Sequence, residues 1–250
     1  MTLIDGKSIS AKVKEEIKSA ASDLATKGVE PALAVILVGE DAASKTYVAS
    51  KEKACAACGI RSVAHRLSSD VSEAALLELI ENLNDDECID GILVQLPLPR
   101  HIDTNKILEK ISPQKDVDGF SAINVGKLTS GLSDGFVPCT PLGVMRLLEE
   151  YGVQIAGKNA VVLGRSNIVG KPMASLLLNA DATVTIAHSK TKDLKRLCAD
   201  ADILVAAVGK AYFVGADMVK QGAVVIDVGI NRGEDGKLRG DVDFDAVAPK

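Results

Sequence analysis

Residues 160–178 read Ala-Val-Val-Leu-Gly-Arg-Ser-Asn-Ile-Val-Gly-Lys-Pro-Met-Ala-Ser-Leu-Leu-Leu, and this stretch decides the fold of the second half of the chain. An apolar run stops at Gly164, and a polar turn leads to Gly170 and Pro172, where a helical pattern begins. A strand that passes through a glycine turn onto a helix N-terminus presents free backbone N–H groups and a positive dipole end, which bind phosphate. The stretch predicts a dinucleotide site, although its spacing departs from G-x-G-x-x-G. Glycines at such a turn are also ordinary turn chemistry.

The residues that follow the next predicted strand favour NADP over NAD. NAD-binding folds place a carboxylate there for the ribose 2′-hydroxyl, whereas this chain has His188-Ser189-Lys190. Arg165 lies in the glycine turn, and its guanidinium can bind phosphate oxygens through two hydrogen bonds. Because no carboxylate at this position repels a 2′-phosphate, we predict NADP as the cofactor.

Composition excludes several classes of protein. A net charge of −5 and the absence of tryptophan argue against nucleic-acid partners. The chain has no apolar run long enough to span a bilayer and no apolar leader at its N-terminus, so we expect a cytoplasmic protein with no membrane partner. The five cysteines are scattered, and we interpret Cys55 and Cys58 as reduced packing residues. The three histidines lie far apart in the sequence, so we predict no metal site.

Strand and helix patterns alternate along the chain, which predicts an α/β fold with mainly parallel sheets. The expected strands are 32–38, 60–67, 89–96, 160–163, 183–187, 203–208 and 223–228. The expected helices are 9–26, 42–58, 72–84, 104–111, 142–151, 192–199 and 216–220, with another that begins near Pro172, and Asp235-Gly236 marks a hairpin turn. Residues 112–141 are rich in glycine and proline. We therefore predict domains at 1–119 and 141–250 with a connection at 120–140.

A second set of polar residues lies in the first half of the chain. Ser44, Tyr47 and Lys51 belong to the predicted helix that follows the first buried strand, Gln95 ends a neighbouring strand, and Asp118 follows further along. Ligands of open α/β sheets bind at the carboxyl ends of the strands. A partly buried lysine with a lowered pKa could donate or accept a proton there. Alternatively, Lys51 belongs to a solvated helix face and Tyr47 to the core.

Tyr-x-x-x-Lys also occurs in short-chain dehydrogenases, but in those enzymes it lies downstream of the glycine turn.

Six motifs in this order resemble the bifunctional methylenetetrahydrofolate dehydrogenase/cyclohydrolase family. They are Ala-Ser-Lys-Thr-Tyr-Val-Ala-Ser-Lys at 43–51, Asp-Gly-Ile-Leu-Val-Gln-Leu-Pro-Leu-Pro at 90–99, Lys-Asp-Val-Asp-Gly at 115–119, Pro-Cys-Thr-Pro at 138–141, Gly-Arg-Ser-Asn-Ile-Val-Gly-Lys-Pro at 164–172 and Val-Ile-Asp-Val-Gly-Ile-Asn at 225–231. The resemblance implies an N-terminal catalytic domain, a C-terminal Rossmann-like NADP-binding domain and an active-site cleft between them. It also implies a homodimer that binds tetrahydrofolate derivatives.

The implied activity is NADP-dependent oxidation of 5,10-methylenetetrahydrofolate to the 5,10-methenyl form, followed by hydrolysis to 10-formyltetrahydrofolate. By this resemblance Lys51 is the general acid and base of the cyclohydrolase step, and Gln95 tunes its protonation state. Tyr47 stacks on the folate and helps to position Lys51. Asp118 holds the pterin by hydrogen bonds, and Ser44 belongs to the substrate site. The implied cofactor residues are Thr140, Gly164, Arg165, Ser166, Ser189 and Ile230.

Two other functions stay open from the sequence. One is a monofunctional or shikimate-dehydrogenase-like NADP oxidoreductase, against which Lys51 and Gln95 argue. The other is a folate- or nucleotide-binding protein without turnover. This last hypothesis arises because family members continue past Gly240-Asp241-Val242 into a further loop and a returning helix, whereas the sequence here ends at Lys250.

Overall fold

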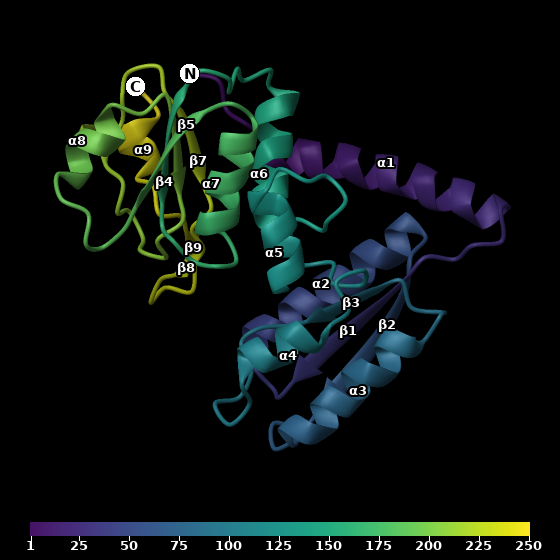
Figure 1. Cartoon of the computed structure of the whole chain (residues 1–250). Coiled ribbons are helices and arrows are strands. Elements are labelled where there is room, and N and C mark those ends of the chain that lie inside the picture. Colours follow the sequence, from purple (N-terminus) through teal and green to yellow (C-terminus); the bar gives the residue numbers. More distant parts are fainter. The chain divides into compact units, whose positions relative to one another are not determined.

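The computed structural model describes residues 1–250 and divides the chain into two compact units (Figure 1). The N-terminal unit comprises Asp5–Gly126 and Asp134–Phe136. The C-terminal unit comprises Met1–Ile4, Lys127–Ser133 and Val137–Lys250. Each unit contains a parallel sheet covered by helices, so the predicted two-domain α/β class is confirmed.

The N-terminal unit has a three-stranded parallel sheet in the order β2-β1-β3. Its strands are β1 (Ala32–Val38), β2 (Arg61–Leu67) and β3 (Gly91–Val94). Its helices are α1 (Gly6–Thr26), α2 (Ala42–Cys58), α3 (Glu73–Asp85) and α4 (Thr104–Lys110), and α5 (Ala122–Thr129) begins in this unit. An isolated parallel bridge between Ile92 and Asp116 places a further segment beside β3, on the side away from β1.

Strand β1 is apolar throughout because both faces of its sheet are covered. Ala34 and Ile36 pack into the core beneath α3 and α4, while Val35 and Leu37 pack with Val48 of α2 on the other face. Ile36 is fully buried, and burial of such a side chain contributes about 1.5–3 kcal/mol. The continuous apolar run predicted this two-sided packing.

The C-terminal unit has a four-stranded parallel sheet in the order β5-β4-β6-β7. Its strands are β4 (Asn159–Leu163), β5 (Thr183–Ala187), β6 (Ile203–Ala206) and β7 (Val224–Asp227), followed by the antiparallel pair β8 (Asn231–Arg232) and β9 (Leu238–Arg239). Its helices are α6 (Cys139–Glu150), α7 (Gly170–Asn179), α8 (Leu194–Ala199), the 3-10 turn η1 (Ala216–Met218) and α9 (Phe244–Val247).

Two apolar clusters lie on opposite faces of this second sheet. Side chains of α6 and α7 fill one cluster, and those of α8, η1 and α9 fill the other. Ile4, from the start of the chain, packs against the cluster of α6 and α7. The first residues of the sequence therefore complete the core of the C-terminal unit.

Local signals set most boundaries to within a few residues, and the differences from the predicted elements include those at α1, β3 and α5. Helix α1 begins three residues earlier than expected because the Asp5 side chain accepts the N–H groups of Lys7 and Ser8. Strand β3 covers only Gly91–Val94 of the expected 89–96, and the chain after it turns toward Pro97, which has no N–H for strand pairing. Helix α5 lies within the stretch expected to be a connection.

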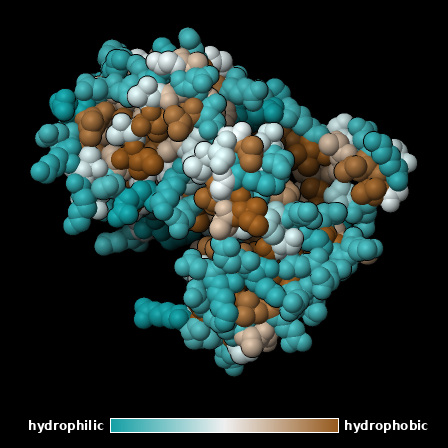
Figure 2. Space-filling model, in the orientation of Figure 1, coloured by the Kyte–Doolittle hydropathy of each residue, from teal (hydrophilic) through white to brown (hydrophobic).

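Hydrophilic residues cover most of the face drawn in Figure 2, and hydrophobic residues form separate patches on it. No helix of the chain is both long enough and apolar enough to cross a membrane.

Candidate active site

In the N-terminal unit, the sheet topology brings Lys51 and Gln95 together. The chain leaves β1 for β2 on one side and later enters β3 on the other, so the carboxyl ends of β1 and β3 form a topological switch point, where ligands of open α/β sheets bind. Helix α2 follows β1 and carries Lys51, while Gln95 directly follows β3. The Lys51 Nζ atom donates to Gln95 Oε1 at 3.1 Å, and Gln95 Nε2 donates to the carbonyl of Leu96 at 2.8 Å. Both side chains are half-buried. The amide therefore holds the ammonium at a fixed position.

Asp118 lies close enough to Lys51 for the two charges to interact. Burial raises the pKa of the Asp118 carboxyl, the positive charge of Lys51 lowers it, and the negative charge of Asp116 raises it again. The net result is a pKa of about 6. This pKa lies closer to neutral pH than that of an ordinary aspartate, so a modest change in its surroundings can alter the protonation state of the carboxyl.

The segment that leads to Asp118 is fixed by a buried polar network. Asp116 is 1% exposed, and its Oδ2 atom accepts from the Ser121 N–H at 2.8 Å and from Asn124 Nδ2 at 3.0 Å. The Oδ1 atom of Asn124 accepts the N–H of Phe136 at 3.2 Å. Sequence reasoning missed Asn124, because an asparagine in a glycine-rich stretch reads as a turn residue.

Tyr47 and Ser44 lie one and two turns before Lys51 on α2, with contrasting exposure. The Tyr47 side chain is 47% exposed, so its ring is available for stacking against a ligand. Ser44 is only 3% exposed, and both its N–H and its hydroxyl bond the side chain of Asp41, the residue that caps α2. These bonds also lower the pKa of the Asp41 carboxyl. Ser44 thus helps to begin the helix that carries Tyr47 and Lys51.

In the C-terminal unit, two glycines allow a tight turn between β4 and α7. Gly164 has a φ of +118°, and a Cβ atom there would lie 2.2 Å from the carbonyl oxygen of Ala207. A Cβ atom on Gly170 would lie 2.3 Å from the carbonyl oxygen of Gly164. The Ser166 hydroxyl oxygen accepts the N–H groups of Val169 and Gly170 at 3.1 and 3.3 Å, which fixes the turn where α7 begins. Only glycine fits at both positions.

This turn has the properties that a dinucleotide phosphate requires. The backbone N–H groups of residues 165–168 donate to no other group of the chain, and they precede the N-terminus of α7. Arg165 and Ser189 are exposed, and each lies two residues past the paired ends Leu163 and Ala187 of adjacent strands. The guanidinium of Arg165 and the hydroxyl of Ser189 therefore lie at the same edge of the sheet, where both could donate hydrogen bonds to a 2′-phosphate.

The other two predicted cofactor residues lie elsewhere in the C-terminal unit. Ile230 is 62% exposed in the segment between β7 and β8. Thr140 is exposed in the first turn of α6, a helix that packs against α7.

Comparison with known proteins gives concordant matches to both units. Residues 4–118 match the tetrahydrofolate dehydrogenase/cyclohydrolase catalytic domain, and residues 138–250 match the NAD(P)-binding domain of the same family. The chain is 70% identical over 250 residues to the bifunctional protein FolD of Campylobacter curvus, covering all of this chain and 86% of that protein. This chain belongs to the tetrahydrofolate dehydrogenase/cyclohydrolase family. The predicted family is therefore confirmed.

Solved structures of the tetrahydrofolate dehydrogenase/cyclohydrolase family have the same fold. The crystal structure of FolD from Campylobacter jejuni matches with a TM-score of 0.99 and 56% identity, covering all of this chain and 89% of that one. The Trypanosoma brucei enzyme, solved with NADP cofactor and an inhibitor, matches with a TM-score of 0.93 and 41% identity. That match covers 98% of this chain and 86% of the other.

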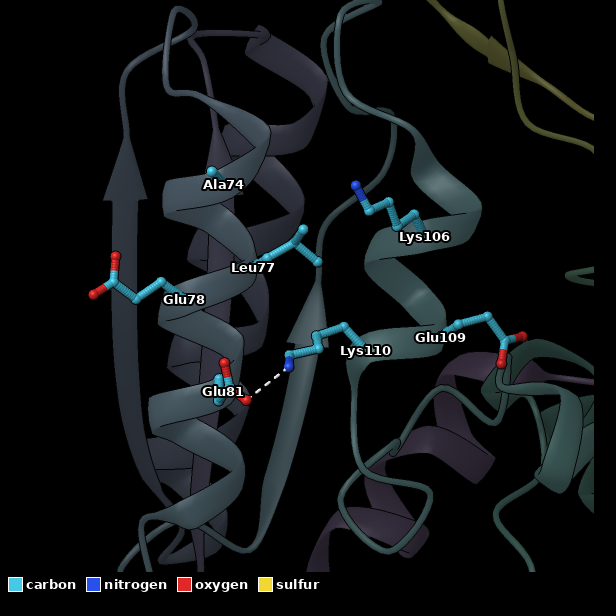
Figure 3. Close-up of a pocket in the computed structure, with 7 residues that line it drawn as sticks. All are labelled: Ala74, Leu77, Glu78, Glu81, Lys106, Glu109 and Lys110. Carbon is cyan, nitrogen blue, oxygen red and sulfur yellow. Dashed lines mark ion pairs between the residues drawn. The ribbon is translucent and has the colours of Figure 1, made fainter.

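A pocket lies between α3 and α4, and none of the candidate site residues lines it (Figure 3). Its charged lining residues are Glu78, Glu81, Lys106, Glu109 and Lys110, and both lysines are paired with glutamates. Lys110 pairs with Glu81 at 2.9 Å, and Lys106 pairs with Glu73 at 2.5 Å. Both lysines of the pocket are therefore already paired with carboxylates, which leaves no free cation there for an anionic ligand.

Proposed function

We propose that this chain is a bifunctional enzyme that oxidises 5,10-methylenetetrahydrofolate with NADP and hydrolyses the 5,10-methenyl product to 10-formyltetrahydrofolate. The observation that carries this proposal is the Lys51–Gln95 hydrogen bond beside Asp118, at the carboxyl edge of β1 and β3. The fold of the C-terminal unit and the family to which the chain belongs supply the redox half of the proposal.

For the oxidation, the residues of the N-terminal unit bind and orient the folate. Bound NADP supplies the acceptor for the hydride that leaves the methylene carbon. The exposed Tyr47 ring stacks on the pterin, and the Asp118 carboxyl exchanges hydrogen bonds with it. Hydride transfer itself needs only close and oriented reactants, so neither side chain has to move a proton in this step.

For the hydrolysis, proton transfers are needed and Lys51 is the group placed to make them. Water adds to the methenyl carbon, and its first proton leaves to solvent. The bond from that carbon to N5 then breaks as the Lys51 ammonium gives a proton to N5, and Lys51 takes up the hydroxyl proton as the carbonyl forms. Gln95 holds Nζ by accepting its hydrogen bond, which keeps the amine aimed at one point.

For the cofactor, the glycine turn and its neighbours hold NADP. The pyrophosphate binds the free N–H groups after Gly164, where the Ser166 hydroxyl fixes the turn. Arg165 and Ser189 bind the 2′-phosphate. The exposed Ile230 side chain packs against the cofactor, and Thr140 contributes a hydroxyl from α6.

We further propose that the protein is cytoplasmic and forms a homodimer. The free state of all five cysteines supports a reducing compartment. The dimer is an expectation that comes from the family.

The experiment that tests the proposal mixes purified protein, 5,10-methylenetetrahydrofolate and NADP and follows methenyl absorbance. We expect the absorbance to rise and then to fall faster than the spontaneous hydrolysis. For Lys51→Met we expect the fall to slow by about a hundredfold or more, while NADP binding is retained. Absence of any methenyl product from the unsubstituted protein would contradict the dehydrogenase role, and unchanged hydrolysis in Lys51→Met would contradict the role of Lys51.

A further inference from the structure

Asp241 is a fully buried carboxylate that binds three successive backbone N–H groups. It is 0% exposed, and it accepts from Val208 at 2.6 Å, from Gly209 at 3.0 Å and from Lys210 at 2.8 Å. The side chain of Asn231 donates a fourth hydrogen bond at 2.9 Å. Three converging amides can hold an anion without a cationic partner, so this buried charge is satisfied by the loop that follows β6.

The loop held by Asp241 touches the glycine turn between β4 and α7. Its first residue, Ala207, donates its N–H to the Leu163 carbonyl at 2.8 Å. The Ala207 carbonyl oxygen occupies the space where a Cβ atom of Gly164 would lie. The order β5-β4-β6-β7 also places the topological switch of this sheet between β4 and β6, where dinucleotides bind. The position of the 207–210 loop therefore determines one wall of the cofactor site.

A second aspartate fixes the first. Asp227, at the end of β7, accepts the N–H groups of Asp241 at 2.9 Å and of Val242 at 3.0 Å. It also accepts the N–H of Gly229, the residue before Ile230, at 3.0 Å. The two carboxylates thus connect the loop after β6, the loop after β7 and the segment after β9.

We infer that Asp241 is a positioning residue for NADP, because it holds the 207–210 loop against the phosphate turn and, through Asn231, the segment that carries Ile230. The inference rests on the proposed function, since it assumes that the site takes NADP. The three loop amides are consumed by Asp241, so the loop shapes the site rather than binding phosphate itself.

The test is Asp241→Asn, which keeps the shape of the side chain but places an amide NH₂ group among N–H donors. We expect the dissociation constant for NADP, measured by titration calorimetry, to rise about tenfold or more, as loss of one charge-assisted hydrogen bond implies. Hydrolysis of 5,10-methenyltetrahydrofolate needs no NADP, and its candidate residues lie in the N-terminal unit. Its rate should therefore stay within about twofold, because Asp241 lies outside that unit. Asp245→Asn, an exposed change in α9, is the matched control and should alter neither quantity.

Amide hydrogen exchange gives a second readout that does not depend on cofactor binding. Peptides that contain Val208 to Lys210 should exchange faster in Asp241→Asn, while peptides of α2 should not change. If neither form binds NADP, the proposed function fails but exchange still tests the positioning role. An unchanged NADP affinity with unchanged loop exchange overturns the inference.

A milder variant covers the case in which Asp241→Asn does not fold. Asn231→Ala removes one donor to Asp241 from a half-buried position, and we expect NADP to bind about threefold or more weakly. NADP affinity equal to that of the unsubstituted protein in this variant would overturn the inference as well.

Discussion

Replacing Asp118 by asparagine should change the pH dependence of stability. Compared with the unsubstituted protein at the same pH, the variant should gain more stability at neutral pH than at acidic pH. The folded state raises the pKa of this carboxyl from 3.8 to about 6, chiefly through burial. Between these two pH values the folded state binds more protons than the unfolded state, so the unsubstituted protein loses stability as pH rises through this window. Asparagine keeps the shape and carries no charge, so the variant does not suffer this loss.

The size of the effect follows from the two pKa values. The difference between 3.8 and about 6 corresponds to about 3 kcal/mol at 25 °C. Asp118→Asn also changes hydrogen bonds, and this contribution to stability is the same at every pH. It therefore does not affect how the stability difference between the two proteins changes with pH. We therefore expect this difference in unfolding free energy to shift by about 3 kcal/mol in favour of the variant between about pH 3 and about pH 8.

The assay is urea unfolding of both proteins across this range, followed by circular dichroism. Asp245→Asn serves as the control for a lost surface carboxylate, because Asp245 is exposed. A flat difference between Asp118→Asn and the unsubstituted protein, or a shift in the opposite direction, would refute the electrostatic account of Asp118. The cyclohydrolase activity need not be measured for this test.

Two further predictions concern the glycine turn. Arg165→Ala should weaken NADP binding about tenfold and leave NAD binding within about twofold, because only NADP carries the 2′-phosphate; calorimetric titration with both cofactors checks this, and equal weakening of the two would remove the assignment of Arg165. Gly170→Ala should destabilise the protein by about 1–3 kcal/mol and weaken NADP binding, because the new Cβ atom would lie 2.3 Å from the Gly164 carbonyl oxygen. Gly143→Ala is the control, since no atom lies within 4 Å of its Cβ position in α6, and it should leave NADP binding unchanged and raise stability by up to about 1 kcal/mol in a thermal melt. Equal melting of Gly170→Ala and the unsubstituted protein would contradict the packing argument.

Much of the fold could be predicted because its signals are local. The apolar run of β1 and the helix that ends at Gly59 have the predicted bounds, and Gly59 adopts the left-handed conformation that ends a helix. Parallel topology then follows from the alternation of strands and helices, and it brings Lys51 and Gln95 to one sheet edge before any coordinate is known.

The rest of the site could not be predicted because it depends on contacts distant in sequence. Asp241 binds amides more than thirty residues before it, and nothing in Gly-Asp-Val distinguishes a buried anion from a surface turn residue. Asn124 bonds Asp116 within a stretch whose glycines and prolines favoured a connection. In both cases the partners of the side chain come together only when the backbone is folded, so local sequence patterns do not predict the hydrogen bonds.

The place of Ile4 in the core of the C-terminal unit affects how the chain is made. The ribosome delivers Ile4 long before Val144, Leu177 and Ile226, which belong to the apolar cluster that Ile4 joins. The N-terminal unit can form its own core soon after residue 126 emerges, whereas Ile4 waits for more than two hundred residues. Until then its side chain stays exposed to water and to chaperones. Folding of the C-terminal unit therefore brings Ile4 to a cluster whose other members are synthesised much later.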